Sequence, residues 1–171
     1  MPTVLCDSGP LIAMAKVNRL HLLLDLWEVV HVTEEVYQEA MVFGQAQGAP
    51  DALTIRLFWQ KHKLPVTAVP ANVLVAYQPA ITLDPGECST FAHALTLRDV
   101  LVLVDDEDAR SEARRLGLPV RGTIGVLVAA HRRGLLSLPE IELLIKELSA
   151  RPDIWISARL CARVLRSLHS V

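Results

Sequence analysis

Carboxylic side chains follow two of the short apolar segments in this chain. Asp7 comes directly after Thr3–Cys6, and the doublet Asp105-Asp106 comes directly after Val100–Val104. The carboxyl ends of parallel strands meet at one edge of a sheet, where open α/β folds bind ligands. Carboxylates gathered there repel one another unless a cation neutralises them. Since no Cys or His cluster accompanies these acids, the pattern predicts a site for Mg²⁺ or Mn²⁺.

Two glutamates are expected to approach the same edge from neighbouring helices. Glu39 lies one turn into the helix predicted after the apolar run Val29–Val32. Glu87 lies in the first turn of the helix predicted to begin at Asp84. A divalent cation held by such acids can activate water and stabilise a phosphoryl oxygen. The constellation therefore suits the hydrolysis of a phosphodiester.

Each of these acids also has a purely structural interpretation. Asp84-Pro85-Gly86-Glu87 has the form of a capping box, in which the glutamate accepts a hydrogen bond from a backbone N–H. Asp106 is a candidate helix N-cap, and Glu39 a candidate solvent-exposed helix acid. Asp7 fits such an interpretation least well. A carboxylate next to a buried strand is costly unless it is paired or bound to a cation.

The elements that would position these acids alternate between strand and helix. Apolar strand segments are predicted at 3–6, 29–32, 65–69, 100–104 and 118–120, with amphipathic helical segments between them and after the last. Because the strand segments are apolar on both faces, they indicate a parallel sheet covered by helices on both sides. We expect a three-layer α/β/α sandwich of the α/β class with four to five parallel strands, plus C-terminal helices.

Composition limits the classes of protein to be considered. The chain has 171 residues, of which 51% are apolar, enough for the core of one domain. The uncharged stretch 64–83 is as long as a membrane span, but Pro65, Pro70 and Pro79 interrupt it. It is predicted to form a short strand and a proline-bounded connection. Cys6, Cys88 and Cys161 form no C-x-x-C pair, and no basic signal region opens the chain, so we expect reduced thiols and a cytoplasmic location.

Charge is nearly balanced overall but unevenly distributed. The 17 Lys and Arg residues stand against 19 Asp and Glu, for a net charge of −2. Any contact with nucleic acid must therefore rest on a local site. Most arginines lie after residue 97, and four are candidates for binding phosphate: Arg110, Arg114, Arg132 and Arg133. The alternative is that they are solvated and pair with Asp108 and Glu112. Trp59 and Trp155 are interpreted as core or dimer contacts, with base stacking as the alternative.

The ordered set of motifs resembles the PIN domain, the nuclease fold of VapC-type toxins. The motifs that carry this resemblance span roughly residues 4–135: Asp7-Ser8-Gly9-Pro10-Leu11-Ile12, Val36-Tyr37-Gln38-Glu39, Gly86-Glu87, Val104-Asp105-Asp106, Ala109-Arg110, Gly117-Leu118-Pro119-Val120 and Gly122-Thr123-Ile124-Gly125. The order of the motifs is more specific than any one of them. It is most similar to a poorly characterised branch that keeps the Asp-Asp…Ala-Arg and Gly-Thr-x-Gly elements.

The resemblance implies a metal-dependent endoribonuclease with four acids: Asp7, Glu39, Glu87 and one of Asp105 or Asp106. Ser8 and Thr123 would be secondary polar residues beside the metal. It further implies an RNA substrate, a homodimer and an antitoxin partner. Residues 1–135 would form the nuclease core and residues 136–171 a helical extension packed on it. Thr33 stands where this branch commonly has proline, and the chain continues past Leu135 with two helices. The alternative is a catalytically weak PIN-like module that acts through protein or RNA contacts.

Overall fold

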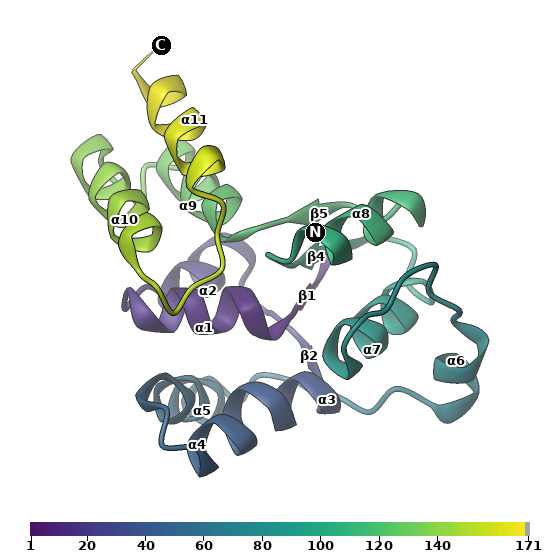
Figure 1. Ribbon diagram of the computed structural model, residues 1–171. Helices are drawn as coiled ribbons and strands as arrows, with labels where there is room; N and C mark the ends of the chain where they lie inside the picture. The colour runs from purple at the N-terminus through teal and green to yellow at the C-terminus, as the bar shows by residue number, and fades with distance from the viewer. Residues whose placement is uncertain (170–171) are drawn as a thin grey trace.

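The computed structural model describes residues 1–169, which form a parallel sheet between helices (Figure 1). Strand β1 (Thr3–Cys6) pairs with β4 (Val100–Leu103), and β4 pairs with β5 (Val120–Arg121). Strands β2 (Val32–Thr33) and β3 (Val66–Thr67) form a second parallel pair. A parallel bridge between Leu5 and His31 joins the pair to β1. The predicted count of four to five strands is reached when this bridged pair is added to the three-stranded sheet.

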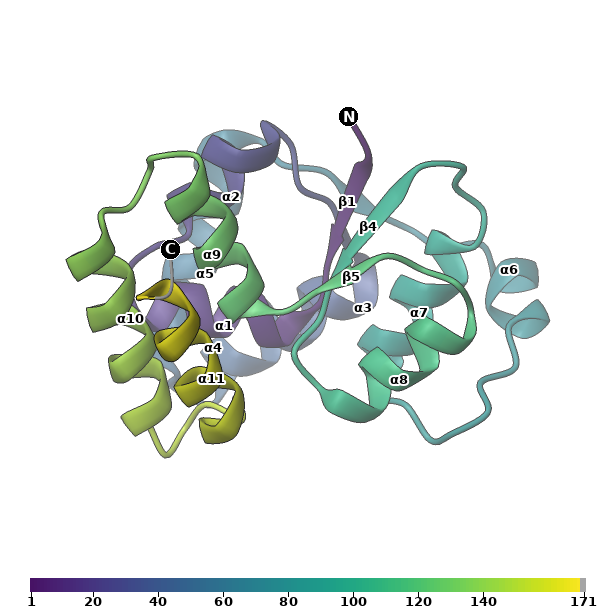
Figure 2. The ribbon, with the colours of Figure 1, turned by 90° about the horizontal axis from the view of Figure 1, so that it is seen from above.

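Alternate residues of the strands point into two separate hydrophobic clusters. Val4 and Cys6 belong to a cluster with side chains of α1 (Ser8–Lys16), α2 (His21–Trp27) and α9 (Thr123–Arg132). Leu5 faces the opposite side, where Phe91 of α7 (Pro85–Ala94) and Ala109 of α8 (Glu107–Arg115) lie. Figure 2 shows the sheet between these two groups of helices. The three-layer α/β/α arrangement predicted from the sequence is confirmed.

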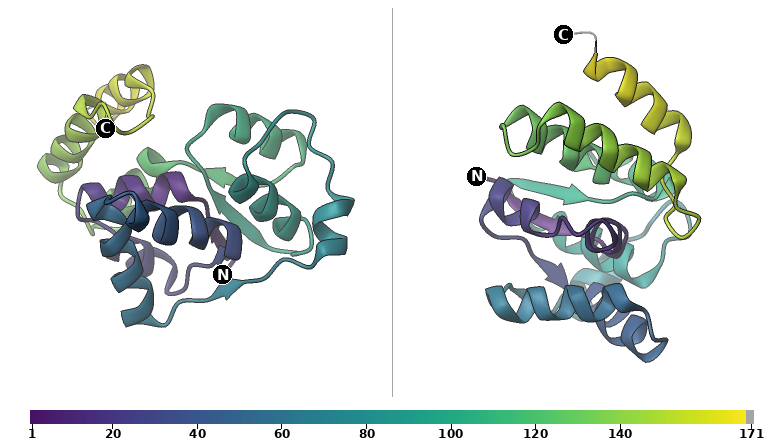
Figure 3. Two further views of the ribbon diagram at one scale, coloured as in Figure 1. Left: turned by 60° about the horizontal axis from the view of Figure 1, so that its bottom comes forward. Right: turned by 90° about the vertical axis from the view of Figure 1, so that its left-hand side faces the viewer.

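Six further helical segments within residues 1–169 extend the layer that contains α1. They are α3 (Glu34–Tyr37), a π-helix η1 (Gln38–Phe43), α4 (Gly44–Ala46), α5 (Pro50–His62), α10 (Leu138–Ala150) and α11 (Ala158–Leu168). Figure 3 shows α5 on one side of α1 and the pair α10–α11 on the other. Ile141 and Leu148 of α10 and Cys161 of α11 are buried in the same cluster as α1. The C-terminal helices thus share the core of the first helices.

Two local predictions need correction. The short strand expected in 64–83 is present as β3, but the proline-bounded connection after it contains a short helix, α6 (Ala71–Ala76), which begins after Pro70. Proline suits a helix start because its N–H is not needed there. The i, i+4, i+7 spacing of Val36, Ala40 and Phe43 predicts that all three face the core, but Phe43 is 60% exposed, and Met41 is buried instead. The π-helix causes this change, since its wider turn shifts which residues face the core.

Other expectations can be compared with burial. Trp59 is 2% exposed and packs in the core, as interpreted, whereas Trp155 is 91% exposed. Cys6, Cys88 and Cys161 are all free thiols. None of the described helices is long and apolar enough to cross a lipid bilayer.

Candidate metal centre

The acids predicted from the sequence meet where β1 and β4 end. Asp7 follows β1, and its backbone N–H donates to the Leu103 carbonyl of β4 at 2.9 Å. Asp105 follows the last residues of the β4 segment. Strand β1 lies between two strands: β2, the next strand along the chain, is on one side of it, and β4 is on the other. This reversal of strand order makes the edge a topological switch point, where open α/β sheets bind ligands.

Asp7 is the most deeply placed of these acids. It is 5% exposed and caps α1, accepting a hydrogen bond from the Gly9 N–H at its Oδ2. Its Oδ1 is buried without a hydrogen-bond partner among the described residues. Burial raises the pKa of Asp7 well above its usual value, and repulsion from Asp84, Glu87 and Glu39 adds to this rise. A cation at Oδ1 would satisfy the oxygen and remove the repulsion.

Glu39 reaches this group from the π-helix. Its Oε1 accepts a hydrogen bond from Ser8 Oγ at 3.2 Å. Burial and Asp84 raise the pKa of Glu39, while the Ser8 hydrogen bond lowers it. A Cβ atom on Gly86 would lie only 2.7 Å from Glu39 Oε2. Glycine is therefore needed at 86 for the carboxylate to rest against the start of α7.

Glu87 completes the capping box that its sequence predicted. The Asp84 N–H donates to Glu87 Oε2 at 3.1 Å, and the Glu87 N–H donates to Asp84 Oδ1 at 2.7 Å. Burial raises the pKa of Glu87 to about 7, although the hydrogen bond from the Asp84 backbone opposes the rise. Asp84, Asp106 and Glu39 raise the pKa further by repulsion. The structural role of Glu87 thus coexists with a place among the acids.

The two members of the aspartate doublet have different surroundings. Thr123 donates to both oxygens of Asp105, from its backbone N–H at 2.7 Å and from its Oγ1 at 2.6 Å. Burial raises the pKa of Asp105, and Thr123 and the nearby Arg110 oppose that rise. Asp106 is exposed and caps α8, its Oδ1 accepting from the Ala109 N–H at 2.9 Å. Asp105 is held in a fixed orientation by a side chain, and Asp106 by the backbone of its own helix.

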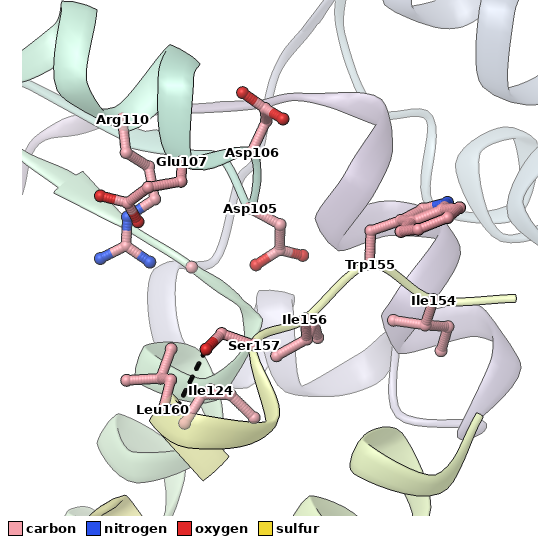
Figure 4. A pocket seen from close by; sticks show the side chains of 11 residues that line it. Asp105, Asp106, Glu107, Arg110, Ile124, Ile154, Trp155, Ile156, Ser157 and Leu160 are labelled. Atoms are coloured by element: carbon pink, nitrogen blue, oxygen red, sulfur yellow. Dashed lines mark hydrogen bonds between the residues drawn. The ribbon is translucent and has the colours of Figure 1, made fainter. Parts of the chain in front are cut away.

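Only one of the four candidate arginines lies at this edge. Arg110 lines a pocket of about 370 Å³ together with Asp105 and Asp106 (Figure 4). Arg114 pairs with Glu107 at 2.8 Å, and Arg133 donates to the Leu26 carbonyl at 2.6 Å. Arg132 ends the helix that Thr123 begins, which places it about 15 Å along the axis from the acids. The Arg115–Glu112 pair is the kind of structural pairing that the alternative interpretation expected.

A larger cleft of about 730 Å³ includes all of the candidate acids and reveals residues that sequence reasoning missed. Asp84 was interpreted only as a helix cap, yet it lines this cleft and repels Asp7 and Glu39. The sequence signal that could have placed Asp84 in the cleft was its spacing of three residues from Glu87, since a capping box brings these two residues into contact. The segment Asp153–Ile156, between α10 and α11, also lines the cleft. Nothing in its local sequence pointed to this contact.

The donor chemistry of the cleft fits a hard divalent cation. Its acids offer carboxylate oxygens, one of them buried and unpartnered, and repulsion from neighbouring acids adds to the raised pKa of Asp7, Glu39 and Glu87. No ion pair joins Asp7, Glu39 or Glu87 to a base within residues 1–169. Over the same residues, no three His, Cys, Asp or Glu side chains are arranged as a ready-made metal centre. Three of the carboxylates instead accept hydrogen bonds, from Thr123 Oγ1, the Asp84 N–H and the Ala109 N–H.

Fold and site together define a class: a parallel α/β/α protein with carboxylates at the switch point of its sheet. The sequence matches the family model of the PIN domain over residues 3–170. The chain therefore belongs to the PIN-domain family, whose members are generally nucleases, and the resemblance to a PIN domain is confirmed at the level of the family. No match to a curated protein was found.

Proposed function

We propose that this protein is a Mg²⁺- or Mn²⁺-dependent endoribonuclease that hydrolyses RNA phosphodiesters at the cleft between β1 and β4. The observation that carries the proposal is the unpartnered, buried Oδ1 of Asp7 amid three repelling acids. Such an arrangement is unfavourable without a cation, so its presence in a nuclease family supports a metal-binding role.

The residues that line the cleft would have the following roles. Asp7, Glu39, Glu87 and the doublet Asp105-Asp106 would supply the oxygen ligands. Ser8 would orient Glu39, and Thr123 would orient Asp105, through the hydrogen bonds already described. Arg110, across the smaller pocket, would hold a phosphate oxygen of the substrate. A bound divalent cation lowers the pKa of water and stabilises charge on a phosphoryl oxygen.

Cleavage of labelled RNA by the purified protein tests this proposal. We expect cutting with Mn²⁺ or Mg²⁺, none with EDTA, and recovery when excess Mn²⁺ is restored. Asp7→Asn should reduce the rate at least 100-fold, while Arg132→Ala, at the far end of α9, should stay within about 2-fold of wild type. Equal rates for Asp7→Asn and wild type would refute the metal mechanism.

A second candidate is a PIN-like binding module without strong catalysis. This candidate is favoured by the helix-capping roles of Glu87 and Asp106. These roles explain the presence of both acids without a metal ion. The same assay separates the two functions. A protein that binds RNA with Mn²⁺ present but never cleaves it would be a binding module.

We also propose that the protein forms a homodimer and has an antitoxin partner, as the family resemblance implies. Large apolar side chains are exposed on the neighbouring elements η1 and α5, with Phe43 at 60%, Leu53 at 45% and Leu57 at 56%. Such a surface is typical of protein contacts. Light scattering should give twice the monomer mass, and Leu57→Glu should return the protein to a monomer.

A further inference from the structure

Trp155 is the most exposed large hydrophobic side chain in the described part of the chain. It is 91% exposed, whereas Trp27 is 8% and Trp59 is 2% exposed. A tryptophan exposed to this extent gains little from folding, because its large apolar surface stays in water. The ring is therefore available for contact with another molecule.

The backbone that carries Trp155 is held on both sides. Asp153 accepts a hydrogen bond from Lys16 Nζ at 2.6 Å and two from the Arg151 guanidinium at 3.0 Å each. On the other side, Ser157 Oγ accepts from the Leu160 N–H and caps α11. Ile154 and Ile156 pack against the main hydrophobic cluster. The backbone is thus fixed while the ring between the two isoleucines projects outward.

The ring of Trp155 borders the proposed metal centre. Trp155 lines both the pocket of Asp105, Asp106 and Arg110 and the larger cleft that holds Asp7. In Figure 4, Asp105 lies between Arg110 on one side and the Trp155 ring on the other. A phosphate held near Asp105 and Arg110 would therefore place a neighbouring base beside the indole.

The helix that follows offers positive charge away from the core. Arg159 and Arg163 lie one turn apart on the exposed face of α11, and that helix contains no acidic residue. Leu160, Cys161 and Val164 pack on its other face. Positive charge beside an exposed aromatic side chain is a combination with which proteins hold single-stranded nucleic acid.

We propose that Trp155 stacks on an unpaired base of the substrate RNA and that Arg159 and Arg163 contact the adjoining phosphates. This inference rests on the proposed ribonuclease function and assigns it three substrate-binding residues outside the candidate acids. A base within a duplex is stacked on its neighbours and has no free face for the indole. The ring thus selects unpaired over paired RNA.

Binding measurements in EDTA test the inference without hydrolysis. The probe is a labelled eight-nucleotide RNA of mixed sequence that cannot pair with itself. Trp155→Ala should weaken binding roughly 5- to 150-fold, the range found for losing one base–aromatic stack. Trp155→Phe should keep most of the affinity, whereas Trp155→Leu, which is apolar but cannot stack, should resemble Trp155→Ala. Because Trp155 is so exposed, all three variants should melt as wild type does.

A matched probe distinguishes stacking from a general apolar contact. In a series of single-stranded RNAs, each lacking one base, one member should lack the base that stacks on Trp155. Wild type and Trp155→Ala should bind that RNA with equal affinity. The affinity for an RNA duplex should be the same for both proteins. Arg159→Ala/Arg163→Ala should reduce the slope of log affinity against log salt by about 1.4. The control Arg98→Ala, before β4 at the opposite edge of the sheet, should leave that slope unchanged.

Several results would overturn the inference. One is equal affinity of wild type and Trp155→Ala for the single-stranded RNA, and another is the absence of RNA binding by wild type. A third is that Trp155→Ala differs from wild type only in its self-association. Cleavage with Mn²⁺ that does not depend on Trp155 would refute this inference alone. Trp155-dependent binding without any cleavage would refute the proposed hydrolysis and leave the stacking contact in place.

Discussion

Thr123 donates hydrogen bonds to both carboxylate oxygens of Asp105, although 18 residues separate the two in sequence. Thr123 begins α9 after β5, while Asp105 follows the neighbouring strand β4. The contact therefore depends on the pairing of β4 with β5, which places the start of α9 beside the end of β4. It fixes the orientation of one acid at the proposed metal centre.

Replacing the Thr123 hydroxyl tests this contact. Thr123→Val removes one hydrogen bond to a buried carboxylate, so the pKa of Asp105 should rise further. The loss of stability should be about 1–3 kcal/mol near pH 8 and smaller near pH 4, because the hydrogen bond stabilises the charged form of Asp105, whose share grows as pH rises. Thr123→Ser keeps the hydroxyl and is the control. Chemical denaturation at the two pH values measures the difference, and an equal loss at both would contradict the prediction.

Gly86→Ala should displace the Glu39 carboxylate, since the new Cβ would lie 2.7 Å from Glu39 Oε2 and 3.2 Å from Val36 Cγ2. Alanine in a helix usually adds about 0.5–1 kcal/mol of stability relative to glycine. Here we expect that gain to be lost and RNA cleavage to fall at least 10-fold. In a Glu39→Gln background, Gly86→Ala should have no further effect on the rate. A full effect in both backgrounds would show that Gly86 acts through something other than Glu39.

Metal-free stability should depend on pH through Glu87. Its pKa is raised from 4.5 to about 7 in the folded protein, so the unfolded chain releases this proton first as pH rises. Glu87 therefore makes stability fall between pH 4.5 and 7, by at most about 3 kcal/mol. Glu87→Gln keeps an oxygen for the Asp84 N–H but cannot ionise. Denaturation curves in EDTA should show wild type losing stability relative to Glu87→Gln over this range, and parallel pH profiles would contradict the assignment.

Arg110 should affect substrate binding more than the other candidate arginines. Arg110→Ala is expected to raise KM about 10- to 100-fold, the value of a charge-assisted contact to phosphate. Arg114→Ala, which loses only an exposed pair with Glu107, should change KM less than 3-fold. Steady-state cleavage of one labelled RNA by both variants makes the comparison. A larger effect from Arg114→Ala would reverse the assignment of roles.

Signals local in sequence predicted much of the fold. Asp84 and Asp106 both accept the capping hydrogen bonds that their positions before helices predicted. Strands β1 and β4 also lie where the apolar runs placed them, because a strand buried on both faces needs an uninterrupted apolar segment. The convergence of acids at one edge followed from the same strand assignments.

Features that depend on tertiary packing were not visible in the sequence. The π-helix at Gln38–Phe43 changes which side chains face the core, and no local pattern marks it. The Lys16–Asp153 pair joins α1 to a segment more than 130 residues later and so brings Trp155 to the cleft. The exposed face of Trp155 follows from how α10 and α11 pack, which the spacing of apolar residues alone does not determine.

The central claim is that the buried Asp7 carboxylate is present to hold a divalent cation, and melting temperatures of wild type and Asp7→Asn test it most directly. In EDTA, Asp7→Asn should melt at the same temperature as wild type or higher, because the substitution removes repulsion from Asp84, Glu87 and Glu39. Mn²⁺ should raise the melting temperature of wild type and leave that of Asp7→Asn nearly unchanged. An equal response of both proteins to Mn²⁺, or a large loss of stability for Asp7→Asn in EDTA, would contradict the claim.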